Sequence, residues 1–235
     1  MFEFLKNIMK NEKPILNLDV KSIHRILKTD IHREPKNNEG EIIFGCGCFW
    51  GAEKCFWKLP GVVTTSVGYA GGVKKKPTYY EVCSGLTGHS EVVRVVWDKS
   101  KIDISDLLKM FWECHNPTQK NRQGNDIGTQ YRSAIYYKSE NYKKIIFASK
   151  EQFQKELNKK NLGLIETEIK VIDTFFYAEE YHQQYLASEG SRQYCSASPT
   201  KVELGDFPGC NYKLNDHVWE NFNWDIDKCV LRSDN

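Results

Sequence analysis

The 235-residue sequence lacks any hydrophobic run near the ~20 residues that a membrane-spanning helix needs. Its start, Met1–Lys6, includes an acid and no long apolar segment, and few arginines precede Arg25. These features predict neither a secretory signal nor a mitochondrial transit peptide. We therefore expect a cytoplasmic protein that does not enter a membrane.

An excess of charge of one sign is also missing. The 33 lysines and arginines nearly balance the 31 acids, which leaves a formal net charge of +2. This balance gives no reason to expect nucleic acid or an anionic membrane surface as a partner. We further expect the chain to act as a monomer.

Cysteine occurs at eight positions, but nowhere as a Cys-x-x-Cys pair. The missing pair argues against a zinc knuckle and a thioredoxin-type dithiol, and no Gly-rich nucleotide loop follows a strand. Eight cysteines in 235 residues fall well below the roughly 8–10% of a disulfide-rich secreted scaffold. We therefore predict reduced thiols, with any disulfide transient and catalytic, and no metal or bound cofactor.

Strand and helix patterns are mixed along the chain rather than strictly alternating. Apolar and β-rich runs predict strands, whereas apolar residues at helical spacing predict helices. The predicted strands are 41–44, 63–69, 91–97, 133–138 and 167–171, and the predicted helices are 52–58, 105–115, 139–160 and 179–186. This order favours an α+β fold, a two-layer sandwich of a mixed sheet with helices packed on it, followed by an irregular C-terminal tail.

Cys48 lies where the first predicted strand meets a helix. The strand leads into Gly45–Cys48, and the helix begins at Phe49 or just after it. Unpaired N–H groups and the helix dipole favour a thiolate at such a position, and the thiolate is the nucleophilic form of cysteine. Position alone leaves a buried, inert Cys48 equally open, and adjacent aromatics such as Phe49 and Trp50 more often belong to a core.

The segment 47–51, Gly-Cys-Phe-Trp-Gly, resembles the signature of the A-type peptide-methionine sulfoxide reductases. Further segments resemble the same family in the family's order, so that the match covers about residues 41–195. They are Leu59–Val62, Gly68–Gly72, Pro77–Tyr79, Glu81–Gly85, Thr87–Glu91, Phe111–Glu113, Gln123–Ser133 and His182–Leu186. So many ordered matches are specific, and they favour a catalytic Cys48 over a structural one.

The resemblance implies thiol-dependent reduction of methionine S-sulfoxide, in proteins or free, to methionine. Cys48 would attack the sulfoxide sulfur, and Glu91 matches the acid that protonates the departing oxygen. Burial would keep that carboxyl neutral. Tyr69 and Tyr131 match hydroxyl donors to the oxygen, and Asp126 matches a further polar residue of the site.

The same resemblance implies a substrate wall and a route for recycling the thiol. Phe49 and Trp50 match the apolar wall that holds the S-methyl group. A sulfenic acid on Cys48 would condense with a second thiol, and Cys195 lies where the family's resolving cysteine belongs. Thioredoxin would then reduce the disulfide. Such an enzyme would serve protein repair under oxidative stress.

The tail departs from the commoner family pattern after Cys195. Many members continue with a glycine-rich run and a second cysteine, whereas this chain has Ser196–Pro199, then Cys210 and Cys229. Either could be the cysteine that faces thioredoxin. We favour Cys210, because Pro208-Gly209-Cys210 is typical of an exposed turn, while Cys229 lies among apolar residues and would suit a packed thiol.

On this interpretation the chain has three parts. Residues 1–37 are an N-terminal extension, residues 38–190 the catalytic domain, and residues 191–235 a C-terminal tail that carries the recycling cysteines. The remaining cysteines are interpreted as structural thiols: Cys46, Cys55, Cys83 and Cys114. Cys46 also forms a Cys-x-Cys sequence with Cys48, and a strained disulfide between the two is the less favoured alternative to a buried thiol at the strand end.

Two other functions would use the same residues. Cys48 paired with His89 or His182 would suit a hydrolase or acyl transferase, and burst release from a thioester would favour it. The aromatic residues alone would suit a non-catalytic module that binds oxidised methionine without changing it. The ordered match leads us to prefer the reductase.

Overall fold

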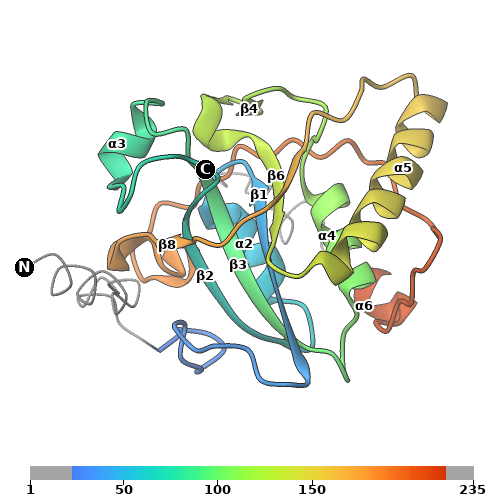
Figure 1. Ribbon diagram of the computed structural model, residues 1–235, viewed down its shortest axis with the longest axis horizontal. Coiled ribbons are helices and arrows are strands. Elements are labelled where there is room, and N and C mark those ends of the chain that lie inside the picture. The colour runs from blue at the N-terminus through green and yellow to red at the C-terminus, as the bar shows by residue number, and fades with distance from the viewer. Residues whose placement is uncertain (1–22, 221–235) are drawn as a thin grey trace, which may run out of the picture.

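A six-stranded sheet forms the centre of residues 23–220, the part of the chain that the computed structural model describes (Figure 1). The strand order is β7-β6-β1-β3-β2-β8, and all neighbours run antiparallel except β6 and β7. This mixed sheet confirms the predicted α+β fold. The strands are β1 (Glu39–Cys46), β2 (Val62–Ala70), β3 (Ser90–Asp98), β6 (Ser133–Tyr137), β7 (Glu168–Val171) and β8 (Phe176–Tyr177).

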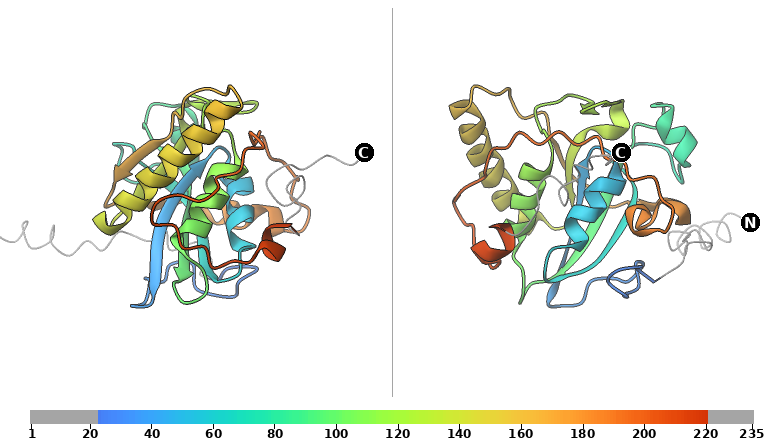
Figure 2. Two further views of the ribbon diagram at one scale, coloured as in Figure 1. Left: turned by 90° about the vertical axis from the view of Figure 1, so that its right-hand side faces the viewer. Right: turned by 180° about the vertical axis from the view of Figure 1, so that it is seen from behind.

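Helices α2 and α4 lie on one face of the sheet, and α5 packs beside α4 (Figure 2). Of the helices in residues 23–220, none combines the length and the apolar character required to cross a membrane. The helical and remaining elements are α2 (Phe49–Trp57), α3 (Tyr79–Cys83), α4 (Ile104–Cys114), β4 (Arg122–Gln123), β5 (Asp126–Ile127), η1 (Thr129–Tyr131), η2 (Glu140–Tyr142), α5 (Lys143–Lys159), η3 (Glu180–His182), η4 (Tyr185–Ala187) and α6 (Asp216–Glu220).

The chain between β7 and β8 covers the opposite face of the sheet. These two strands form opposite edges, so their connection crosses the inner strands (Figure 1). Ile172 and Phe175 pack there against a small apolar cluster made of Ile43, Ala70, Val92, Ala134 and Tyr136. The inner strands are therefore covered on both sides, and β3 is buried throughout Ser90–Trp97.

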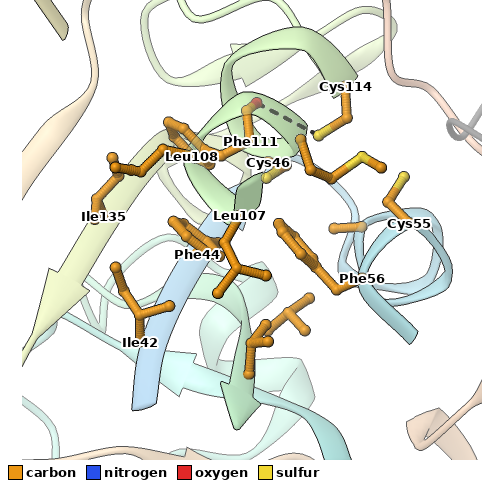
Figure 3. Close-up of a cluster of buried hydrophobic side chains, with 14 of the residues drawn as sticks. Ile42, Phe44, Cys46, Cys55, Phe56, Leu107, Leu108, Phe111, Cys114 and Ile135 are labelled. Carbon is orange, nitrogen blue, oxygen red and sulfur yellow. Dashed lines mark hydrogen bonds between the residues drawn. The ribbon is translucent and has the colours of Figure 1, made fainter. Parts of the chain in front are cut away.

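The main core lies between the sheet and helices α2, α4 and α5. Phe44 of β1 is fully buried, and its ring stacks on Phe56 of α2 and Phe111 of α4 (Figure 3). The centroid distances are 4.9 Å and 5.1 Å. Stacked aromatic pairs contribute about 0.5–1.5 kcal/mol beyond the area they bury. One side chain thus connects the sheet to both helices that position the site.

The C-terminal tail has little regular structure, as predicted, but much of it packs against the helices. Val202, Leu204 and Phe207 are buried in the main core. The backbone N–H of Lys213 donates to Asp106, in the first turn of α4, at 3.0 Å. Figure 2 (right) shows the tail crossing the helical face of the molecule. The tail is therefore attached along α4.

The predicted helix over 179–186 is wrong. The segment forms two separate turns, η3 and η4, and between them Gln184 takes a left-handed conformation with φ +48°. The Gln184 backbone N–H and side-chain amide donate to the buried carboxylate of Glu53 at 2.8 Å and 2.7 Å. These bonds hold Gln184 out of helical geometry. Apolar spacing in the segment carries no signal of so distant a partner.

Replacing Phe44 with alanine should lower the free energy of unfolding by about 3–5 kcal/mol, the usual cost of removing a fully buried phenylalanine. Urea unfolding followed by circular dichroism measures this. Phe147→Ala on α5 is the control, because that ring is 39% exposed and its loss should shift the midpoint far less. Equal shifts in the two variants would contradict the role given to Phe44.

Candidate active site

Cys48 lies directly before α2 and caps its N-terminus, where the sequence places it. Gly47 precedes it with φ +92°, a conformation that strongly favours glycine. A Cβ atom on Gly47 would also lie only 2.6 Å from the side chain of Gln123. A glycine here therefore lets the chain turn sharply from β1 into α2, and the turn brings the thiol to the end of the sheet.

The pKa of the Cys48 thiol is raised well above its ordinary value, which differs from the expectation for a helix N-terminus. Burial of the sulfur is the largest cause, followed by the repulsion that Glu91 and Cys195 exert in their ionised forms. A hydrogen bond from the Trp50 backbone N–H opposes them, as a helix N-terminus should. Cys48 is thus a neutral thiol in the substrate-free protein at pH 7.

Glu91 of β3 supplies a neutral acid next to this thiol. Its side chain is 2% exposed and accepts a hydrogen bond from the Phe49 backbone N–H at 3.1 Å. Burial raises its pKa to about 8, the bond from Phe49 opposes the rise, and the charge of Asp126 adds to it. A carboxyl with this pKa holds its proton at pH 7 and can donate it.

Tyr69 of β2 is fully buried, and its hydroxyl donates to Glu179 at 2.8 Å. The other carboxylate oxygen of Glu179 accepts the Tyr79 backbone N–H at 2.9 Å. Burial and the charge of Glu179 raise the pKa of the Tyr69 hydroxyl, so it keeps its proton. Sequence reasoning missed Glu179, whose only signal is an acid just before the matched segment His182–Leu186.

Tyr131 ends η1 and is half-buried. Burial raises the pKa of its hydroxyl, and the charges of Glu91 and Asp126 raise it further. Tyr69 also feels the charge of Glu91. The structure thus brings both predicted tyrosines, still protonated, within electrostatic range of the acid that lies beside Cys48.

Asp126 of β5 holds the C-terminal tail. It accepts a hydrogen bond from the Tyr194 hydroxyl at 2.6 Å and a second from the Ser196 hydroxyl. These two residues flank Cys195, which lies within electrostatic range of the Cys48 thiol. Neither Tyr194 nor Ser196 was predicted as a site residue. The sequence therefore did not indicate the hydrogen-bond partners of Asp126.

Gln123 of β4 also fastens the tail. Its buried side-chain oxygen accepts the backbone N–H groups of Asn116 and Ser198, each at 3.1 Å. The next residue, Gly124, approaches the tail so closely that a Cβ there would lie 2.0 Å from the Ser196 carbonyl oxygen. The tail is thus folded back onto the β4–β5 hairpin beside Cys48.

Aromatic rings form a wall next to Cys48. The Trp50 indole stacks on Tyr185 at 3.9 Å and donates its N–H to His182 Nδ1 at 3.0 Å. The Phe49 ring is buried, 5.0 Å from the His182 ring. Burial lowers the pKa of His182 to about 4, so it is a neutral acceptor that orients Trp50. Both predicted wall residues therefore lie together.

A Cys–His pair is not supported by this geometry. His182 is bonded to the Trp50 indole, and the His89 ring packs against Phe176. The groups that set the Cys48 pKa are carboxylates, a backbone N–H and another cysteine rather than an imidazole. The hydrolase alternative thus lacks its base.

Cys210 lies away from Cys195. The N–H of the next residue, Asn211, donates to Ser105 in the first turn of α4 at 3.0 Å. Cys195 lies within electrostatic range of Cys46, whose sulfur is within 4.8 Å of that of Cys114, the last residue of α4. At 1.5 Å per residue the helix spans roughly 16 Å. A disulfide needs Cα atoms within about 7 Å, so these cysteines could pair only after the tail moves. The other candidate, Cys229, lies outside the described residues.

One group of side chains has the composition of a metal site. The ligand atoms of Cys46, Cys114 and His115 lie within 4.8 Å of one another, and all three residues are buried. However, His115 Nδ1 is 2.8 Å from the Phe111 carbonyl oxygen, and its Nε2 is 2.7 Å from the Ser133 hydroxyl. Both imidazole nitrogens are occupied, so we assign no metal here.

Known proteins similar to this chain share one activity. A family model described as peptide methionine sulfoxide reductase matches residues 40–205. Peptide methionine sulfoxide reductase MsrA of Vibrio vulnificus is 51% identical over 183 residues, which cover 78% of this chain and 87% of that protein. MsrA of Pseudomonas putida strain W619 is 59% identical over 169 residues, which cover 71% and 76%.

Two solved structures are similar as well. Methionine sulfoxide reductase A of Corynebacterium diphtheriae has a TM-score of 0.63 and 38% identity, covering 74% of this chain and 90% of that one. Reduced Mxr1 of Saccharomyces cerevisiae has a TM-score of 0.62 and 32% identity, covering 71% and 95%. From the extent of these matches, the chain belongs to the peptide methionine sulfoxide reductase family and is an oxidoreductase.

Proposed function

We propose that this chain reduces methionine S-sulfoxide, in proteins or free, with Cys48 as the nucleophile. The observation that carries the proposal is the Glu91 carboxyl, which is buried, holds a proton and is bonded to the N–H next to Cys48. We assign the reaction to residues 38–190 and the recycling of the thiol to residues 191–235. Such an activity would repair proteins oxidised at methionine.

The chemistry uses two protons, one on Glu91 and one on Cys48. Glu91 gives its proton to the sulfoxide oxygen as the Cys48 sulfur bonds to the sulfoxide sulfur, and the thiol proton returns to Glu91. The oxygen passes to Cys48, and the sulfide leaves. Sulfoxide and thiol thus become methionine and a sulfenic acid, with no other reactant consumed.

The tyrosines and the aromatic wall hold the substrate during this step. The hydroxyls of Tyr69 and Tyr131 donate to the sulfoxide oxygen, which requires Tyr69 to turn its proton away from Glu179. Phe49 and Trp50 enclose the S-methyl group, supported by the ring contacts that fix them. The tyrosine hydroxyls thus bind the sulfoxide oxygen, and the aromatic wall binds the methyl group on the same sulfur.

Cys195 resolves the sulfenic acid. Its thiol attacks the Cys48 sulfur, a disulfide forms, and the oxygen leaves as water. Asp126 supports this role, because it bonds the residues on both sides of Cys195. We propose that thioredoxin supplies the two electrons that reopen the disulfide. Cys210 could take part only after the tail leaves α4, so we place thioredoxin's first attack at Cys195.

Cys48→Ser should abolish methionine formation from a methionine-sulfoxide peptide, because a hydroxyl is far less nucleophilic than a thiol. Peptide chromatography with mass detection measures the product. Cys83→Ala is the control, since it removes a half-buried thiol that the proposed reaction does not use. Turnover retained in Cys48→Ser would refute the assignment of the nucleophile.

Cys195→Ser should form one methionine per chain and then stall, because nothing resolves the sulfenic acid on Cys48. A sulfenic-acid reagent such as dimedone should then label Cys48, as peptide mass mapping can verify. Steady turnover of this variant with thioredoxin would show that another thiol is the resolving partner.

Glu91 should carry its proton at pH 7 and lose it as the pH rises through about 8. We expect the infrared spectrum of the parent minus that of Glu91→Gln to show the band of a protonated carboxyl at neutral pH. The band should vanish at higher pH. The subtraction removes the contribution of other buried acids, such as Glu53, whose pKa is raised to about 7, and Asp106, whose pKa is also raised. Glu91→Gln should also slow the first turnover by roughly 10²–10⁴-fold. A difference band absent at pH 7 would contradict the assignment of the acid.

A further inference from the structure

Three buried thiols that the proposed reaction does not use lie together in the main core. Cys46 ends β1, Cys114 ends α4, and Cys55 lies within α2. Figure 3 shows the three at one end of the core. The sulfur atoms of Cys46 and Cys114 lie within 4.8 Å of each other, and each thiol influences the pKa of the other. The sequence favoured a structural role for all three and did not indicate that they lie together.

The tail brings Cys195 to the same place. Three backbone segments converge on the buried side chain of Gln123. The side-chain oxygen accepts the backbone N–H groups of Asn116 and Ser198, and Gly47 lies against the side chain. Each segment comes just after a cysteine: Asn116 after Cys114, Ser198 after Cys195 and Gly47 after Cys46. Cys195 also packs against the core cluster that contains the other two.

The surroundings of Cys114 suit a thiol or a disulfide better than a metal ligand. Its sulfur donates to the Phe111 carbonyl oxygen at 3.5 Å, as the dashed line in Figure 3 marks, and lies 3.9 Å from His115 Nδ1. His115 is neutral, since burial lowers its pKa to about 4, and both its nitrogens are occupied. A disulfide to Cys46 would need no further ligand.

We propose that Cys46 and Cys114 form a second redox pair, which takes over the disulfide first made between Cys48 and Cys195. This inference rests on the proposed function, which supplies that first disulfide. The oxidising equivalent comes from the sulfoxide itself. The pair would therefore store oxidising equivalents inside the core until a reductant arrives.

The transfer takes two thiol–disulfide exchanges. The Cys46 sulfur attacks that of Cys195; the Cys46–Cys195 bond forms, the Cys48–Cys195 bond breaks, and the proton of Cys46 passes to Cys48. Cys114 then attacks Cys46 and releases Cys195 as a thiol, to which its own proton passes. Each step exchanges one disulfide for another, so no outside oxidant or reductant is consumed.

The consequence is a second turnover without reductant, because Cys48 and Cys195 are thiols again. Burial raises the pKa of the thiols of both Cys46 and Cys114. Few molecules then carry the reactive thiolate, so we expect this exchange to be slow. Methionine should form in two phases, one equivalent per chain in each.

The test counts methionine formed per chain when reductant is absent. The full chain with Cys210→Ser and Cys229→Ser is reduced, freed of reductant and mixed with excess methionine-sulfoxide peptide. We expect two methionines per chain, and mass mapping should find disulfides 48–195 and 46–114. Adding Cys46→Ala and Cys114→Ala should lower the count to one. Cys55→Ala, which removes a thiol from the same core, is the matched control and should leave the count at two.

One methionine per chain in the parent, with Cys46 and Cys114 still open to alkylation after unfolding, would overturn the proposal. A second methionine would overturn it as well if the disulfide formed beside 48–195 is not 46–114. The mapping uses a chain with its core intact, so it decides the matter even if the alanine variant does not fold. The absence of any methionine would refute the proposed function itself, and the inference with it.

Discussion

The hydrogen bond from the Phe49 N–H to the Glu91 carboxyl is the contact on which the site depends. It joins the start of the inner strand β3 to the first turn of α2, and so fixes an acid beside the thiol of Cys48. Because the carboxyl is buried, it remains protonated at neutral pH. An N–H group at the N-terminus of α2 thus holds the acid in place. At other helix N-termini, such N–H groups lower the pKa of a cysteine and favour its thiolate.

A second constraint is the attachment of the tail. Residues 194–198 have no helix or strand of their own to hold them, so their position comes from side chains of the β4–β5 hairpin. Asp126 and Gln123 provide it through hydrogen bonds to the hydroxyls and backbone around Cys195. A thiol that must meet Cys48 is thereby placed on an irregular segment whose neighbours on both sides are fastened.

The sequence predicted what depends on local pattern. The strands 91–97 and 133–138 and the helix 105–115 lie within one residue of β3, β6 and α4, because apolar spacing determines such elements. It could not predict contacts between residues that lie far apart in the sequence. Glu179 meets Tyr69 across 110 positions, and Gln184 leaves the predicted helix for Glu53, 131 positions away. The raised pKa of Cys48 likewise follows from burial and a distant carboxyl, which a helix-terminus argument does not include.

The crossing between β7 and β8 has a consequence for synthesis of the chain. The four inner strands come from residues 39–137, whereas both edge strands come from residues 168–177. On the ribosome the inner strands emerge first, with a row of unpaired backbone groups along each side. Such open edges are templates for pairing with other chains. A nascent chain that stalls before residue 168 therefore exposes both edges at once, and the short late segment 168–177 supplies both edge strands.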